Sequence, residues 1–138
     1  VYKSLNCGEG SMDKKKNVRK NLTFVSKKMG IKRSNLILMY QTHSNKVIEV
    51  KKNKFSRKIR SDAIITRDKK IALGVVTADC VPVLLCDAKN EMVGCIHAGW
   101  KGALKGIIKN TVSKIRKNNK YGKFLLALGH VLEGKIMR

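Results

Sequence analysis

Three residues with metal-ligand chemistry stand at breaks in the strand-like pattern of the sequence: His43, Cys80 and His97. Two imidazoles and one thiolate leave one tetrahedral position of a zinc ion open, as in catalytic rather than structural zinc sites. Zinc lowers the pKa of a bound water towards ~7 and so provides a nucleophile at neutral pH. The spacings of 37 and then 17 residues match no compact ligand motif, so this prediction rests on residue type.

Further polar residues lie beside these three in the sequence. Asp79 directly precedes Cys80, where a carboxylate can relay a proton or hold a ligand in place. After His97, two glycines and a lysine open a predicted helix, and the amides of a helix start favour anions such as phosphate. We assign catalysis to Cys80 and Asp79, and substrate or phosphate binding to Gln41, Gly99, Lys101 and Gly102.

The same residues also support chemistry without a metal. In this alternative Cys80 is a nucleophile, His97 is its base, and Asp79 or Gln41 orients the imidazole. Both interpretations predict that Cys80 is essential, but only the first predicts bound zinc.

Two helices and seven strands are expected to position these residues. Helical spacing of apolar residues predicts helices over residues 13–29, ended by Gly30, and over residues 100–117. The apolar stripe of the second helix comprises Leu104, Ile107, Ile108, Thr111, Val112 and Ile115. Short apolar runs predict strands at residues 36–40, 47–50, 63–66, 71–76, 83–86, 92–96 and 124–128. We expect hairpin-like turns at 68–70 and 87–90, and a solvated loop over the lysine-rich segment 51–60.

The charge of the chain invites a nucleic-acid interpretation, because 31 Lys and Arg face nine Asp and Glu in 138 residues, a net charge of +22. The residue types weaken it. Lys outnumbers Arg 24 to 7, and Lys, Ile and Asn all have A/T-rich codons. Aromatic residues are only 5%, too few for base-stacking platforms, and residues 61–100 carry a net charge of −1. A basic nucleic-acid-binding protein is therefore kept only as an alternative function.

The cysteines indicate a reducing environment. Cys7, Cys80, Cys86 and Cys95 form no C-x-x-C pair, and no signal peptide precedes them. The longest apolar run, 71–86, is interrupted by Thr77 and Asp79 and is too short to cross a bilayer. We expect a cytoplasmic protein with free thiols and no membrane partner.

Five motifs occur in order along the chain: Ser4-Leu5-Asn6, Gln41-Thr42-His43-Ser44, Ser61-Asp62-Ala63, Thr77-Ala78-Asp79-Cys80-Val81-Pro82 and His97-Ala98-Gly99-Trp100-Lys101-Gly102. With them the chain resembles the laccase-domain family, also labelled multicopper polyphenol oxidases. Members are also called purine nucleoside phosphorylases and, in bacteria, peptidoglycan editing factors. The resemblance runs from Ser4 to about Gly129. It implies an α/β fold with mixed β-sheets and flanking helices.

The resemblance also implies a chemistry. The family's metal ligands correspond to His43, Cys80 and His97, and its metals are zinc and copper. Its reported reactions are phosphorolysis of adenosine, inosine, guanosine and methylthioadenosine, and deamination of adenosine. Oxidation of phenols by several coppers is also claimed, but this chain has three histidines, the third being His130, which is too few for several copper sites. Hydrolytic editing of peptidoglycan precursors through Cys80 is the alternative function.

Both ends of the chain depart from the family pattern. An Arg- and Gly-rich segment precedes the S-L-N motif in the family, whereas only Val1, Tyr2 and Lys3 precede it here. After Gly129 the family continues G-P-C-I-G and then Y-E. Inserting one base into one allowed coding of residues 129–138 gives G-P-C-I-G-R-K-N-Y-E. We therefore expect residues 1–138 to form a single partial domain, with 130–138 an out-of-frame tail.

Overall fold

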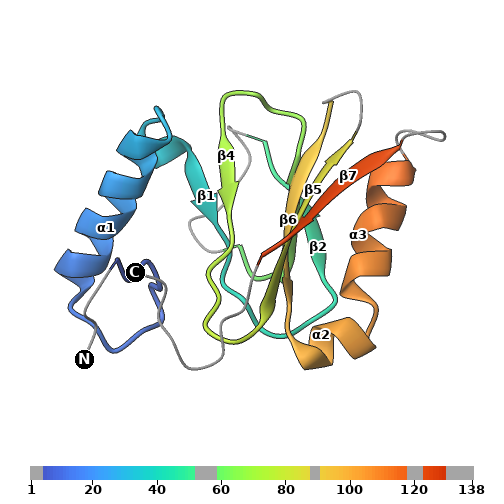
Figure 1. Cartoon of the computed structure of the whole chain (residues 1–138), viewed down its shortest axis with the longest axis horizontal. Coiled ribbons are helices and arrows are strands. Elements are labelled where there is room, and N and C mark those ends of the chain that lie inside the picture. Colours follow the sequence, from blue (N-terminus) through green and yellow to red (C-terminus); the bar gives the residue numbers. More distant parts are fainter. Residues whose placement is uncertain (1–4, 52–58, 88–90, 118–122, 130–138) are drawn as a thin grey trace.

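The structure is a computed structural model, and it describes residues 5–51, 59–87, 91–117 and 123–129. Its elements run in the order α1 (Lys15–Lys28), a 3-10 turn η1 (Arg33–Asn35), β1 (Leu36–Leu38), β2 (Val47–Glu49), β3 (Ala63–Thr66), β4 (Ala72–Gly74), β5 (Val81–Asp87), β6 (Val93–Ala98), α2 (Trp100–Leu104), α3 (Ile107–Arg116) and β7 (Phe124–Leu128). Figure 1 shows α1 and α3 at opposite ends of the molecule with the strands between them.

The strands form two sheets. β1 and β4 pair in parallel as a two-stranded sheet, and the larger sheet has the order β2-β3-β6-β5-β7. In the larger sheet β2 and β3 are parallel, whereas β3–β6, β6–β5 and β5–β7 are antiparallel. The expected α/β fold with mixed sheets and flanking helices is thereby confirmed.

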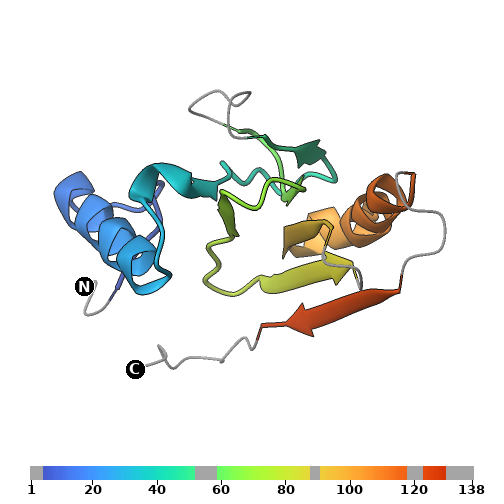
Figure 2. The ribbon, with the colours of Figure 1, turned by 90° about the horizontal axis from the view of Figure 1, so that it is seen from above.

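Three buried clusters join these elements into layers (Figures 1 and 2). Val18 and Leu22 of α1 pack on Leu36 of β1. The next residue, Ile37, points the other way and packs with Ile64 on one face of the larger sheet. The opposite face of that sheet packs on α3 through a cluster comprising Ala63, Ile65, Val83, Leu85, Met92, Ile96, Ile107 and Ile115. Successive residues of one strand therefore pack into different buried clusters, on opposite faces of their sheet.

The first helix agrees with the sequence prediction to within two residues at each end. It ends in a Schellman arrangement, in which Gly30 N–H donates to the Lys27 carbonyl at 3.0 Å and Ile31 N–H donates to the Ser26 carbonyl at 3.0 Å. Gly30 has φ of +69°, a left-handed conformation that favours glycine.

The second predicted helix is wrong as a single element. It is divided into α2 and α3 at Gly106, whose φ of +77° is incompatible with a continuous right-handed helix. The break turns α2 away, so Leu104 is 80% exposed and leaves the predicted apolar stripe. In α3 the buried positions are Ile107, Thr111 and Ile115, whereas Ile108 is 37% exposed.

Within the described residues each of the seven predicted strands forms, and all but β3 and β7 are shifted by one or two residues at one or both ends. β5 begins two residues before the prediction, and β4 covers only the middle of the predicted run 71–76. The turn expected at 68–70 forms, with the Ile71 N–H donating to the Asp68 carbonyl at 3.3 Å, but the strands beside it do not pair as a hairpin, because β3 and β4 belong to different sheets. β5 and β6 do form an antiparallel pair around 87–90 as predicted, although 88–90 lie outside the described residues.

Two further predictions fall mainly outside the described residues: the solvated loop at 51–60, of which 52–58 are not described, and the out-of-frame tail at 130–138 with His130. Within the described part of the chain, no helix is both long and apolar enough to span a bilayer.

Candidate metal centre

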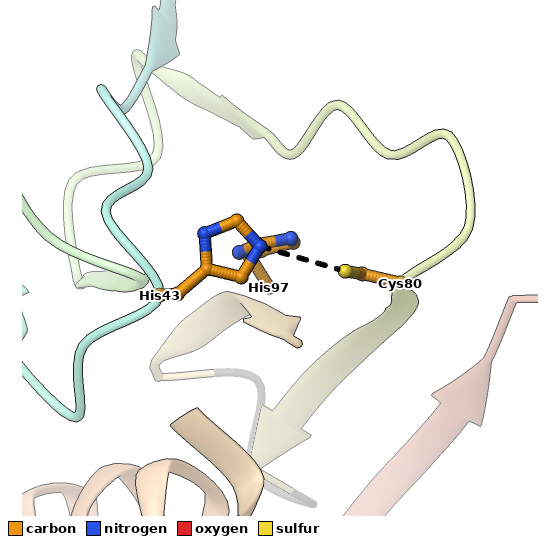
Figure 3. A group of neighbouring side chains, drawn as sticks. All are labelled: His43, Cys80 and His97. Atoms are coloured by element: carbon orange, nitrogen blue, oxygen red, sulfur yellow. Dashed lines mark hydrogen bonds between the residues drawn. The ribbon is translucent and has the colours of Figure 1, made fainter. Parts of the chain in front are cut away.

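His43, Cys80 and His97 come together at one end of the larger sheet, as their residue types predicted (Figure 3). His43 lies in the loop between β1 and β2, Cys80 directly precedes β5, and His97 lies near the end of β6. One ligand atom from each residue lies within 4.8 Å of the other two. The Cys80 Sγ is 3.8 Å from the His43 Nε2, and the two imidazole rings stand edge to face with centroids 4.8 Å apart.

A buried carboxylate that the sequence assignment of site residues did not include lies behind the two histidines. Asp62 is fully buried, and its Oδ1 is 2.9 Å from the Nδ1 of His97. The same carboxylate accepts hydrogen bonds from the backbone N–H groups of Thr42, His43 and Ser44 at 2.7–3.1 Å. It also accepts bonds from the Thr42 and Ser44 hydroxyls, at 3.2 and 2.6 Å.

These hydrogen bonds fix the ionisation of the carboxyl and the tautomer of its partner. Burial by itself raises the pKa of Asp62, but the hydrogen bonds from Ser44, His97 and Thr42 outweigh burial and lower this pKa to about 2. An ionised carboxylate only accepts hydrogen bonds, so the Nδ1 of His97 carries the proton. The Nε2 of His97 is then the nitrogen left to ligate a metal.

Two glycines allow the start of α2 to approach the candidate ligands. A Cβ at Gly99 would lie 2.6 Å from the Cδ2 of His43 and 3.2 Å from the Sγ of Cys80. A Cβ at Gly102 would lie 2.8 Å from the carbonyl oxygen of Ser44. Both predicted site glycines therefore lie against the site, where any larger side chain would displace the loop of His43 or its imidazole.

Gln41, expected in substrate binding, has both ends of its amide engaged with the chain. Its Nε2 donates to the carbonyl oxygen of Val76 at 2.8 Å, and its Oε1 accepts from the N–H of Val76 at 3.2 Å. These two hydrogen bonds join the loop that carries His43 to the segment that leads to Cys80.

The remaining predicted site residues are exposed beside the centre. Asp79 lies on the loop that presents Cys80. Lys101 lies in the first turn of α2, with its Nζ 5.3 Å from the ring centroid of Trp100, which is itself 67% exposed. α2 has only five residues, so its N-terminus contributes a smaller dipole than the long helix expected from the sequence.

The donor set fits a single zinc ion. Zinc bonds of about 2.0–2.1 Å to nitrogen and 2.3 Å to sulfur place tetrahedral ligand atoms about 3.3–3.6 Å apart, so the widest pair here must close by about 1 Å. His97 already has the carboxylate partner that zinc-binding histidines usually have. His43 is exposed and Cys80 half-buried, which leaves one side of the centre open to a substrate.

Asp62 carried a signal in the sequence that residue-type reasoning did not use. It directly precedes the fully buried apolar strand β3, where an acidic side chain is costly unless it is hydrogen-bonded. Its partners, however, lie about 20 and 35 residues away in the sequence. Only the fold brings them to one carboxylate.

Comparisons with known proteins agree with this fold. YlmD from Geobacillus stearothermophilus superposes with a TM-score of 0.86 at 23% identity, over 94% of this chain and 52% of its own. The Neisseria meningitidis protein NMB0706 superposes with a TM-score of 0.83 at 30% identity, over 95% of this chain and 52% of its own.

Sequence relatives carry one common name. A protein of Bacteroides thetaiotaomicron called purine nucleoside phosphorylase is 33% identical over 124 residues, 84% of this chain and 46% of its own length. A protein of Aquifex aeolicus with the same name is 43% identical over 82 residues, 59% of this chain and 38% of its own. The chain thus spans about half the length of the curated relatives it matches. The sequence model of the family described as multi-copper polyphenol oxidoreductase laccase matches residues 1–136, and the chain belongs to that family.

Proposed function

We propose that this protein is a metal-dependent purine nucleoside phosphorylase in which His43, Cys80 and His97 hold one zinc ion. The observation that carries the proposal is the convergence of these three ligand atoms within 4.8 Å, in a chain whose relatives are named purine nucleoside phosphorylases. Copper is the alternative metal, because two imidazoles and a thiolate also suit it. The substrates proposed are adenosine, inosine, guanosine and methylthioadenosine, together with phosphate.

In phosphorolysis an oxygen of phosphate bonds to the anomeric carbon of ribose while the glycosidic bond to the purine breaks. When bound, zinc supplies a Lewis acid with one position open to a reacting oxygen. We assign the attraction of phosphate to the exposed side chain of Lys101, which lies two residues after Gly99 in the first turn of α2. Asp79 holds or moves the proton that the departing purine exchanges with solvent.

Deamination of adenosine is a second reaction that the same donor set favours. A water oxygen bonds to the purine carbon that carries the amine, and ammonia leaves. Three protein ligands with one open position are the usual arrangement for activating water. Asp79 is then the carboxylate that accepts the proton of water and passes it to the leaving amine.

One contact supports the metal-free alternative, a cysteine hydrolase that edits peptidoglycan precursors. The Sγ of Cys80 is 3.8 Å from the Nε2 of His43, within reach of a thiol–imidazole hydrogen bond. The imidazole paired with the thiol is therefore His43 rather than His97, because the latter is held by Asp62.

The test compares metal content with activity in the purified protein. We expect about one equivalent of zinc, and release of purine from inosine that depends on phosphate and stops when a chelator removes the metal. Cys80→Ala should lose both zinc and activity. Cys7→Ala, a half-buried cysteine that packs beside α1, is the matched control and should keep both.

Each part of the proposal can fail separately. Phosphorolysis that survives chelation would refute the metal dependence. Zinc-loaded protein that leaves inosine intact in phosphate would refute the phosphorylase assignment. Adenosine assayed in the same way, with ammonia as the product measured, decides the deaminase activity.

A further inference from the structure

We propose that Asp62 is the positioning residue of the metal centre: this one carboxylate holds both histidine ligands in place, so that metal affinity depends on a residue that does not itself bind the metal. The proposal rests on the proposed function, in that His43, Cys80 and His97 bind a metal. The observation behind it is that Asp62 contacts the backbone of one histidine and the ring of the other, although they are 54 residues apart in the sequence.

The two carboxylate oxygens of Asp62 accept hydrogen bonds from different parts of the site. Oδ1 accepts from the backbone N–H of His43 and from the Nδ1 of His97, both at 2.9 Å. Oδ2 accepts from the backbone N–H of Ser44 at 2.7 Å and from its hydroxyl at 2.6 Å. One oxygen therefore binds both histidines, and the other binds the residue that follows His43.

For His97 the carboxylate fixes the ring. The hydrogen bond at Nδ1 stops the imidazole from rotating about its side-chain bonds and leaves Nε2 as the ring nitrogen that is free of Asp62. The ring is 4% exposed, so no water competes for that bond. An unanchored imidazole would have to lose rotational freedom and change tautomer at the moment of metal binding.

For His43 the carboxylate fixes the backbone. His43 has φ of +57°, a left-handed conformation that is uncommon for residues other than glycine. Three successive N–H groups, those of residues 42, 43 and 44, point at the one carboxylate, an arrangement that holds a turn around an anion. Removing the anion would let the loop relax to ordinary dihedral angles and carry the imidazole away from Cys80.

Asparagine is the appropriate replacement, because it keeps the size of the side chain and removes the charge. An amide offers one acceptor atom and one NH₂ group in place of two acceptors. If the NH₂ group of the asparagine takes the place of Oδ2, it faces the Ser44 N–H, which is also a donor. If the NH₂ group takes the place of Oδ1, it faces the donors of both histidines. In either orientation at least one backbone or ring N–H loses its acceptor.

Asp87→Asn provides a matched control. Asp87 is a second buried carboxylate, 1% exposed, at the opposite end of β5 from Cys80. The seven residues of β5 separate the two by about 20 Å. The control thus makes the same chemical change at similar burial, away from the metal centre.

The experiment measures zinc affinity by competition with a chromophoric chelator in the wild type and both variants. We expect Asp62→Asn to bind zinc 10–100-fold more weakly, the range seen when the partner of a metal-bound histidine is removed. Asp87→Asn should bind within threefold of the wild type. The cobalt-substituted protein provides a second readout, since the thiolate-to-cobalt absorption band of Cys80 should weaken in Asp62→Asn alone. An Asp62→Asn protein with wild-type zinc affinity would overturn the proposal.

A measurement on the unaltered protein covers the case in which Asp62→Asn does not fold. Nitrogen NMR of the zinc-free wild type reports which nitrogen of His97 carries the proton. We expect Nδ1 to carry a proton, as the donor to Asp62, and an Nδ1 without a proton would overturn the proposal. If the wild type binds no zinc at all, the proposed function fails, whereas this measurement still decides whether Asp62 holds His97.

Discussion

Gly99 offers the sharpest test of the centre's geometry, because its replacement acts on the ligands without straining the backbone. Its φ of −70° and ψ of 155° are open to any residue, so Gly99→Ala changes only the space that the site has. The new Cβ would lie 2.6 Å from the Cδ2 of His43, whereas ordinary Cβ contacts begin near 3.4 Å. The imidazole therefore moves by about 0.8 Å to reach ordinary contact with the new methyl group.

That displacement is large on the scale of metal coordination. Metal–ligand distances hold to within about 0.2 Å, so a ring displaced by about 0.8 Å no longer ligates in its original place. We expect zinc affinity to fall at least ~100-fold. At a free zinc concentration of ~100 times the wild-type dissociation constant, bound zinc stabilises the wild type by about 2.7 kcal/mol, and the variant by only about 0.4 kcal/mol.

The assay is thermal unfolding with and without zinc, together with a zinc competition titration. Gly94→Ala is the matched control, because Gly94 lies in β6, away from the candidate ligands, and its Cβ would lie 2.9 Å from the Cγ2 of Ile65 in β3. Overpacking should cost each variant about 1–3 kcal/mol without zinc. Only Gly99→Ala should lose the stabilisation by zinc. If it keeps a zinc-dependent shift equal to that of the wild type, the three residues do not form the metal centre described here.

Three further outcomes follow from the contacts of the site. The carboxylate of Asp62, with its pKa lowered from 3.8 to about 2, should stabilise the zinc-free protein by about 2 kcal/mol at neutral pH. This contribution is lost as the pH falls from about 4 towards 2, and urea denaturation across that range measures the loss. Gln41→Ala removes both hydrogen bonds to Val76, so zinc affinity should fall several-fold as the Cys80 segment loosens, and a titration that finds no change would contradict this link. Lys101→Met should raise the KM for phosphate by about fivefold with zinc content unchanged, whereas Lys105→Met, at the end of α2, should leave that KM as it is.

The sequence predicted well those features that depend on neighbours along the chain. Strands β3 and β7 have their predicted ends, because each is a short apolar run bounded by polar residues. The division of residues 100–117 was missed because apolar spacing continues across Gly106, and only its left-handed φ reveals the break. At 68–70 the predicted turn forms without a hairpin, because a turn sequence shows that the chain reverses but not which strands will pair.

The sequence predicted the candidate metal ligands, but not the hydrogen bonds of Asp62 and Gln41 that hold those ligands in place. His43, Cys80 and His97 have side chains whose chemistry is visible in the sequence alone. Asp62 and Gln41 act through hydrogen bonds to segments 18–35 residues away. The buried strand after Asp62 indicates that its carboxylate is hydrogen-bonded, but nothing local indicates the partners of either residue. Such long-range hydrogen bonds can be identified only when the topology is known. The parallel pairing of β2 with β3 and the antiparallel pairing of β3 with β6 bring Asp62 to both histidines.

The proposed reactions and the family's description make opposite predictions about redox chemistry. Phosphorolysis and deamination exchange bonds without net electron transfer, so redox-inactive zinc should suffice for both. Oxidation of a phenol needs an electron acceptor, and a multi-copper mechanism needs several adjoining metal sites. Within the described residues, His43, Cys80 and His97 form the one group of three histidine, cysteine or acidic side chains placed to hold a metal, which provides for a single ion. We therefore expect zinc-loaded protein to release purine from inosine and to leave phenols unoxidised in air. Oxygen uptake with a phenolic substrate measures this, and uptake by protein that contains only zinc would show that the chemistry assigned to this centre is wrong.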